Sequence, residues 1–270
     1  MIFLKSENEI KLMRESAQLV SRTLAEVARH IEPGVKTAKL DQVAEDYITT
    51  NDARPAFKGY GSRSNPFPGS LCISVNEQVV HGIPGSYELQ EGDIVSIDCG
   101  VERQGYYGDS AYTFAVGECD DETMELLRTT MQSLYLGIDQ AIHGNTVGDI
   151  SSAVQSHCEK KGFGVVRDLV GHGLGKSLHE DPSVPNFGRR GTGKRLRAGM
   201  TLAIEPMINL GSWKVKTLKD GWTIVTADGS KSAHYEHDIV VREGNAEILS
   251  TFEYIEEITK IRIDEIQLNG

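Results

Sequence analysis

Apolar residues recur at helical spacing in four stretches of the chain. In the first, over residues 7–30, they recur every three or four positions, which predicts an amphipathic helix: Ile10, Met13, Ala17, Val20, Leu24 and Val27. Ser6 and Glu9 form the sequence pattern of a capping box at its start. Thr37 is placed to cap a second helix that runs to Ile48. Two further helices are predicted from Asp121 to about residue 143 and over residues 147–161.

Other stretches show the alternation that is typical of strands. In the segment Leu89–Phe114, Val95 and Ile97 alternate with polar residues, and the segment predicts a β-hairpin. Residues 70–75, 78–81 and 196–208 predict further strands. Residues 222–244 predict a hairpin that turns at Asp228-Gly229. Residues 251–263 carry a last strand-like segment, whereas residues 51–69 are rich in Gly, Pro, Ser and Asn and predict a loop.

The predicted hairpin brings two carboxylates together. Gln104-Gly105 lies where a turn is expected. A two-residue turn at Arg103-Gln104 would place Asp98 opposite Asp109, and a bulge at Gly105 would shift the pairing by one residue. Either register makes the two side chains cross-strand neighbours, with Cβ atoms about 4.5–5.5 Å apart. Like charges that face each other on a half-buried hairpin are destabilising. Either one carboxylate keeps a proton or a cation lies between them, and we favour the cation.

The two halves of the chain resemble each other. The segment Leu89–Asp98 aligns without a gap on Leu196–Glu205, and His81-Gly-Ile-Pro84 matches His179-Glu-Asp-Pro182. Further correspondences pair Gly34 with Gly144 and Asp109 with Glu236. A repeat of roughly 110 residues is too long for a solenoid. It predicts a single domain over residues 1–270, with pseudo-repeats at about 5–117 and 118–250 that pack around a pseudo-two-fold axis.

This symmetry would make four carboxylates converge on one centre: Asp98, Asp109, Glu205 and Glu236. They cannot all ionise there without cations, because repulsion at a few ångströms costs several kcal/mol at an effective dielectric constant of about 20. His172, between two glycines, is the leading fifth ligand, and the mostly oxygen set suits a pair of Mn, Co, Fe or Zn ions. Such a pair would hold a bridging hydroxide, a nucleophile for amides or esters. His81 and His179 would then bind the substrate carbonyl and the tetrahedral intermediate.

Simpler interpretations exist for each residue. Asp98 alone could be a surface carboxylate at a strand end, but its gapless match to Glu205 favours function. His172 could be a loop histidine. His234 and His237 flank Glu236 and are candidates for supporting it. Cys99, next to Asp98, would point to the opposite face of the sheet and pack in the core.

Composition and charge exclude several classes of function. The 270 residues are 39% hydrophobic and 25% charged, which is ordinary for a globular protein. A formal net charge of −11 disfavours direct DNA binding and binding to anionic membranes. We find neither a signal peptide nor an apolar stretch of the roughly 18 residues that a membrane span requires. The four cysteines are far apart without a CxxC pair, which favours a reducing, cytoplasmic setting.

Several motifs together resemble those of type I methionine aminopeptidases over roughly residues 5–250. These motifs are, in chain order, Pro55-Ala-Phe-Lys-Gly-Tyr60, Ser74-Val-Asn-Glu77, Val80-His-Gly-Ile-Pro84, Gly171-His-Gly173, Ile204-Glu-Pro-Met207 and Tyr235-Glu-His237. The resemblance implies the α/β (α+β) pita-bread fold, with two pseudo-symmetric α/β halves around a central antiparallel sheet. It further implies removal of the initiator Met from nascent chains whose second residue is small.

The resemblance also implies roles for individual residues. Asp98, Asp109, His172, Glu205 and Glu236 would ligate two divalent metal ions, and Glu205 would also take a proton from the nucleophilic water. His81 and His179 would contact the substrate and its intermediate. The pocket for the Met side chain would be formed by Phe67, Cys72, Met207 and Trp222. A monovalent cation is implied near Asn76, Gln78 and Ser232.

The implied partners are the N-termini of nascent peptides, with the ribosome as a further candidate and a monomer as the expected state. No residue pattern fixes the physiological metal, ribosome contacts or the oligomeric state. Two departures from the family pattern affect the pocket rim. The segment Gly61–Asn65 is longer than usual, and Leu178 stands where some relatives carry an aromatic residue.

Two other functions remain open. An X-Pro peptidase would use the same fold, although such relatives usually have a further N-terminal domain and only about 80 residues precede His81. A metal-free peptide-binding module on this scaffold should have lost ligand residues, and this chain keeps all five.

Overall fold

The computed structural model describes residues 2–260. Among them the helices are α1 (Glu7–Ala28), α2 (Thr37–Thr50), α3 (Asp121–Ile138), α4 (Val147–Lys160) and α5 (Glu253–Thr259). The strands of the first half are β1 (Arg54–Pro55), β2 (Gly61–Ser62), β3 (Asn65–Pro66), β4 (Leu71–Val75), β5 (Gln78–Val80), β6 (Ile94–Arg103) and β7 (Tyr106–Ala115). Those of the second half are β8 (Gly164–Val165), β9 (Val170–Gly173), β10 (Glu180–Pro185), β11 (Thr201–Ile204), β12 (Met207–Asn209), β13 (Val215–Thr217), β14 (Ile224–Thr226), β15 (Ser232–His234), β16 (His237–Val240) and β17 (Glu247–Ile248).

Every pairing between these strands is antiparallel. The first half is built on the long β6–β7 hairpin, with β4 and β1 on the other edge of β6. The second half contains a sheet of order β10-β9-β11-β16-β17 and a sheet of order β15-β12-β8. A three-stranded sheet, β13-β14-β5, joins the halves, because β5 comes from the first and β14 from the second.

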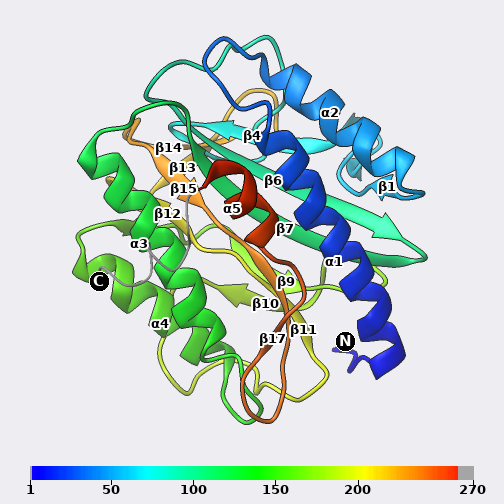
Figure 1. Cartoon of the computed structure of the whole chain (residues 1–270). Helices are drawn as coiled ribbons and strands as arrows, with labels where there is room; N and C mark the ends of the chain where they lie inside the picture. Colours follow the sequence, from blue (N-terminus) through cyan, green and yellow to red (C-terminus); the bar gives the residue numbers. More distant parts are fainter. Residues whose placement is uncertain (1, 261–270) are drawn as a thin grey trace.

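The helices cover these strands in two groups. α1 crosses the β6–β7 hairpin, while α3 and α4 pack together against strands of the second half (Figure 1). Of the helices in residues 2–260, none is both long enough and apolar enough to span a bilayer.

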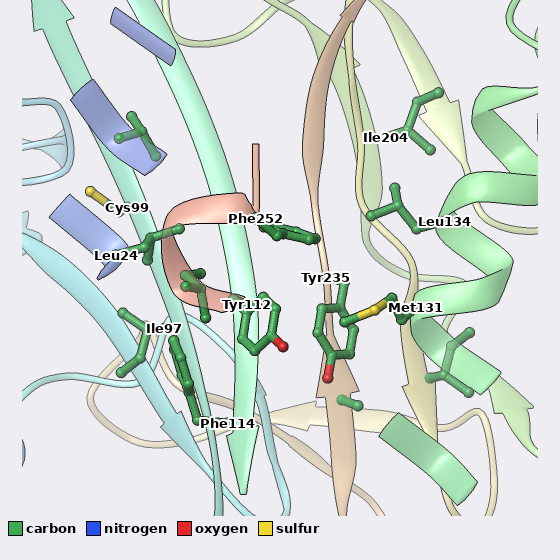
Figure 2. Close-up of a cluster of buried hydrophobic side chains, with 14 of the residues drawn as sticks. Leu24, Ile97, Cys99, Tyr112, Phe114, Met131, Leu134, Ile204, Tyr235 and Phe252 are labelled. Carbon is green, nitrogen blue, oxygen red and sulfur yellow. The ribbon is translucent and has the colours of Figure 1, made fainter. Parts of the chain in front are cut away.

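One hydrophobic core continues from one half into the other. The Tyr112 ring of β7 packs edge-on against the Tyr235 and Phe252 rings, with centroids 5.0 and 4.9 Å away (Figure 2). Leu24 of α1 lies on one side of this aromatic group and Leu134 of α3 on the other. Burial of these large apolar side chains supplies the main stabilising term of the fold and fixes the two halves against each other.

The predicted helix starts are partly correct. At α1 the capping box is confirmed, because the Ser6 hydroxyl accepts from the Glu9 amide at 3.4 Å and the Glu9 carboxylate accepts from the Ser6 amide at 2.9 Å. Thr37 is not the cap of α2. Lys36 takes that position, and the Thr37 hydroxyl instead donates to the Gly85 carbonyl at 3.2 Å. The third helix is shorter than predicted and ends at Ile138.

Corresponding backbone contacts recur in the two halves. Gly34 donates to the Leu89 carbonyl at 2.7 Å, and Gly144 donates to the Leu196 carbonyl at 3.0 Å. Both glycines have left-handed φ values, 90° and 93°, that favour glycine. These contacts join the segments that the sequence alignment paired, and they are consistent with an internal duplication whose boundaries stay a prediction.

Two predictions for the C-terminal part are wrong. β14 does not form a hairpin with β15 through Asp228-Gly229. It pairs with β13 and β5, while β15 pairs with β12. Within the strand-like segment 251–263, residues Glu253–Thr259 form helix α5, whose Ile255 is buried in the core, and residues 261–263 lie outside the described part. The predicted loop at 51–69 is mostly irregular but contains the short strands β1, β2 and β3.

Candidate metal centre

The β6–β7 hairpin places Asp98 and Asp109 on one face, in a register that differs from the prediction. Asp98 pairs with Ala111 and Asp109 pairs with Gly100, without a bulge. The turn is at Gln104-Gly105, where φ is 54° and 80°. Two-residue hairpin turns of this kind need positive φ at both positions, and Gly105 accepts it readily. The turn signal at Gln104-Gly105 is therefore confirmed. The register that a turn at Arg103-Gln104 would give is wrong, and the two carboxylates are diagonal rather than direct neighbours.

Strand alternation separates the core face of the hairpin from the face that carries the carboxylates. Ile97 and Cys99 are fully buried in the core, as predicted for Cys99. Asp98 points the other way, into a cavity, together with its register partner Cys72 on β4. Asp109 lines the same cavity and is 3% exposed.

In the second half the two glutamates lie where strands are interrupted. Glu205 separates β11 from β12 and precedes Pro206, while Glu236 separates β15 from β16. Tyr235 packs in the core, and Glu236 points into the cavity that contains Asp98 and Asp109. The Glu236 amide donates to the Ala111 carbonyl at 2.9 Å, which joins this segment to β7. All four predicted carboxylates thus line one cavity.

His172 on β9 faces the same cavity. Its Nδ1 lies 2.9 Å from the Gly173 carbonyl, which accepts the Nδ1 proton. Its Nε2 therefore carries the lone pair, 3.6 Å from Oε1 of Glu205. This is how metal-binding histidines are usually oriented. A Cβ at Gly171 would come within 2.4 Å of the Ala203 carbonyl, so the flanking glycine is needed for close approach of β11.

The buried charges have few partners. Among the described residues, Asp98 Oδ1, Asp109 Oδ1 and Glu236 Oε1 are buried and accept no hydrogen bond. Burial raises the pKa of Asp98 to about 7 and raises the pKa of Asp109, Glu205 and Glu236 well above the usual carboxyl range, with mutual repulsion as a further cause for the last three. Burial lowers the pKa of His172 to about 3. Buried carboxylates without hydrogen-bond partners and a neutral imidazole are suitable ligands for divalent cations, whose charge would offset that of the carboxylates.

His81 and His179 border this carboxylate group. His81 directly follows β5 and has a φ of 57°. This left-handed conformation costs a non-glycine residue about 1 kcal/mol and is concentrated at functional sites. Burial lowers the pKa of His81 to about 4 and also lowers the pKa of His179. Nδ1 of His179 forms a hydrogen bond of 2.7 Å with the Tyr60 hydroxyl, and its ring centroid is 4.2 Å from that of His172.

Mostly apolar side chains, together with Asp168 and Tyr60, form the rest of the cavity, whose volume is about 370 Å³. All four residues predicted for the Met pocket line it: Phe67, Cys72, Met207 and Trp222. Phe57 and Tyr60 also line the cavity and were not predicted to do so, although both belong to the Pro55–Tyr60 motif. Leu178 lines it too, as expected for a rim residue.

Two buried residues, Asp238 and His234, contact the carboxylate group in ways that were not predicted. Asp238 is fully buried, and its Oδ2 accepts the Asp109 amide proton at 2.7 Å. His234 is 1% exposed, and its Nε2 lies 3.7 Å from Oε2 of Glu205. Both are two positions from Glu236, so period-two spacing from Glu236 would have indicated them.

His237, the other histidine near Glu236 in the sequence, points away from the cavity that the carboxylates line. His237 contacts the Ser250 hydroxyl at 2.7 Å and the Tyr135 hydroxyl at 3.2 Å. Its ring stacks on Phe252 with centroids 3.9 Å apart. His237 therefore supports the core and does not line the cavity.

The residues proposed for a monovalent cation are close together. The Ser232 amide donates to the Asn76 carbonyl at 2.9 Å, and Gln78 follows Asn76 across the β4–β5 turn. Their side chains bond within the protein: the Asn76 amide group donates to Asp93, Gln78 Oε1 accepts from Val75, and the Ser232 hydroxyl donates to Asn209. The cation stays a prediction.

Within residues 2–260, potential metal ligands cluster in two groups that share Glu236. One contains Asp109, His172 and Glu236, and the other contains Glu205, His234 and Glu236, with the ligand atoms of each group within 4.8 Å of one another. A larger cavity of about 630 Å³ lies beside α4 and contains neither group. The fold and the site together define a metal-dependent hydrolase, in which carboxylates and imidazole line an apolar pocket.

Comparison with known proteins identifies the family of hydrolases to which the chain is similar. Residues 11–243 match metallopeptidase family M24. The chain is 54% identical over 251 residues to a methionine aminopeptidase of Clostridium perfringens, covering 93% of this chain and 99% of the relative. The crystal structure of a methionine aminopeptidase from Thermotoga maritima matches with a TM-score of 0.90 at 46% identity, covering 93% of this chain and 100% of that chain. An X-Pro aminopeptidase from the same species matches with a TM-score of 0.72 at 20% identity over 92% of this chain and 62% of that chain, which shows the fold alone.

The chain belongs to metallopeptidase family M24 and has the pita-bread fold of these structures. It is a metal-dependent peptidase, and family membership implies divalent ions as its cofactor.

Proposed function

We propose that this protein is a methionyl aminopeptidase that removes the initiator Met from nascent proteins and peptides with a small second residue. The observation that carries the proposal is one cavity in which potential metal ligands border an apolar wall. A cavity of about 370 Å³ suits one side chain of the size of Met. The names of relatives at 54% and 46% identity support the same activity.

The proposed cofactor is a pair of divalent ions, with Co, Mn, Fe or Zn as candidates. Asp98, Asp109, His172, Glu205 and Glu236 would hold them, and the buried carboxylate oxygens without hydrogen-bond partners support this choice. Such a pair would lower the pKa of a bound water, so that hydroxide would be available as the nucleophile near neutral pH.

The chain's own residues would supply the remaining steps. Glu205 would accept the proton of the attacking water, because its carboxylate points into the cavity and one of its oxygens faces His172. His81 and His179 would hold the substrate carbonyl and its tetrahedral intermediate. The Tyr60 hydroxyl would fix the orientation of the His179 ring through the bond to Nδ1. Phe67, Cys72, Met207 and Trp222 would enclose the Met side chain.

The cellular setting belongs to the same proposal. We infer a cytoplasmic monomer that acts on the N-termini of nascent peptides, with the ribosome as a candidate partner and neither DNA nor membranes as partners. The four cysteines are all free, which suits a reducing compartment. We also infer a single domain over residues 1–270 with pseudo-repeats at about 5–117 and 118–250, which the matching contacts of Gly34 and Gly144 support.

A direct test strips the protein of metal with a chelator, restores Co²⁺ or Mn²⁺, and assays a Met-Ala-Ser peptide. We expect release of Met only in the restored samples, and little release from a Met-Leu-Ser peptide. An Ala-Pro peptide distinguishes an X-Pro peptidase, which should cleave it in preference to Met-Ala-Ser. Failure to release Met under either metal would refute the proposed activity.

A further inference from the structure

His234 is a buried imidazole that the proposed ligand set leaves without a role. It ends β15 on the same side as Glu236, and its side chain is 2% exposed. Among the described residues its Nε2 has no hydrogen-bond partner. A buried polar atom without a partner is destabilising, so the native protein should supply a partner for Nε2.

The distances around Nε2 are those between ligands of a shared ion. Nε2 lies 3.7 Å from Glu205 Oε2 and 4.0 Å from Glu236 Oε2, both too long for a hydrogen bond. Two atoms that each bind one ion at about 2.1 Å lie about 3.0 Å apart at a right angle and about 4.2 Å apart when opposite. Both distances fall in this range, as does the 3.6 Å between His172 Nε2 and Glu205 Oε1.

We infer that His234 is a sixth protein ligand of the metal centre and binds, through Nε2, the ion that Glu205 and Glu236 hold. The inference rests on the metal centre proposed above and adds a residue to it. The two oxygens of Glu205 would then each lie beside a ligating imidazole, Oε1 beside His172 and Oε2 beside His234. A second imidazole favours Co²⁺, Fe²⁺ or Zn²⁺ over Mg²⁺ or Ca²⁺, which prefer oxygen ligands.

His237 provides a matched control. It is buried to the same extent as His234 and follows Glu236 in the sequence, whereas His234 precedes it. Both of its ring nitrogens contact hydroxyl groups, and its ring stacks on Phe252. Loss of its imidazole should affect packing and leave metal coordination unchanged.

The test counts imidazole ligands in the protein loaded with two equivalents of Co²⁺. Each histidine bound to the paramagnetic ion gives a strongly shifted proton resonance from its ring N–H, which buried rings protect from exchange with solvent. We expect two such resonances in the native protein, one in His234→Gln and two in His237→Gln. Calorimetric titration with Co²⁺ should show at least tenfold weaker binding of one ion in His234→Gln and little change in His237→Gln.

A single shifted N–H resonance in the native protein would overturn the inference and would leave His234 as a hydrogen-bond donor to Glu205. The native spectrum decides this even where His234→Gln fails to fold. Met release from the same Co²⁺ sample separates the two proposals. One resonance with Met release refutes only the sixth ligand, whereas two resonances without Met release refute only the aminopeptidase activity.

Discussion

Removal of the metal ions should make the protein less stable as the pH rises above neutrality. Burial raises the pKa of Asp98 to about 7 and raises the pKa of Asp109, Glu205 and Glu236 well above the usual range. In the unfolded chain these carboxyl groups titrate near pH 4. At intermediate pH the metal-free folded state therefore binds more protons than the unfolded state, and its free energy of unfolding falls with rising pH.

Buried imidazoles oppose this trend in acid. Burial lowers the pKa of His172 and His234 to about 3, so these rings are neutral in the folded protein and protonated in the unfolded chain at acid pH. Burial also lowers the pKa of His81, His179 and His237. Unfolded imidazoles are half protonated at their ordinary pKa of about 6.5, so this opposing effect becomes small only above about pH 7. The informative window is thus about pH 7–8. Each carboxyl group that keeps its proton throughout removes about 1.4 kcal/mol over this window.

Urea unfolding at constant ionic strength measures this effect. In EDTA the free energy of unfolding should fall between pH 7 and 8, by about 1.4 kcal/mol for each carboxyl group that keeps its proton. With saturating Mn²⁺ it should not fall, because the ions stabilise the ionised carboxylates. The Glu205→Gln variant in EDTA should show a weaker pH dependence than the native protein, because one of the carboxyl groups with a raised pKa is removed. A metal-free protein that is equally stable at both pH values would refute the reasoning.

Three further predictions concern single residues. The Asp109→Asn variant should bind one divalent ion in place of two and lose most of its activity, because a ligand charge is removed; elemental analysis showing two ions and a native rate would contradict that role. The Tyr60→Phe variant keeps the ring but loses the bond to His179 Nδ1. Its kcat should fall about tenfold with little change in KM, and an unchanged pH–rate profile together with a native kcat would exclude a positioning role. Because Ile2 is bulky, the protein should not process its own N-terminus; intact-mass measurement should show Met1 retained, and a chain that begins at Ile2 would contradict the small-residue rule.

Local patterns were the best guide to the fold. The capping box of Ser6 and Glu9 and the amphipathic spacing of α1 depend on residues close in sequence, and both are present in the structure. The hairpin and its turn signal at Gln104-Gly105 were also predicted, but the register was not. A turn at Arg103-Gln104 would leave the same side chains on each face of the hairpin, so alternation alone does not distinguish the two registers. Pairing of β14 with β5 joins segments far apart in the chain, which alternation alone cannot specify.

The candidate site was largely accessible from the sequence because of the internal duplication. Matching Asp98 with Glu205 placed two carboxylates in equivalent positions, and the structure puts both in one cavity. His234 and Asp238 were harder to predict. When Glu236 is matched with Asp109, they fall opposite Tyr107 and Ala111 in the first half, which carry no similar side chain. The helix at Glu253–Thr259 was read as a strand because a short apolar run fits either period.

The central claim is that acidic side chains from the two halves meet at a shared pair of divalent ions. An anomalous difference map from crystals soaked in Co²⁺ tests it most directly. We predict two peaks in the cavity that Asp98, Asp109, His172, Glu205 and Glu236 line. A map without a peak in that cavity at saturating Co²⁺ would contradict the account.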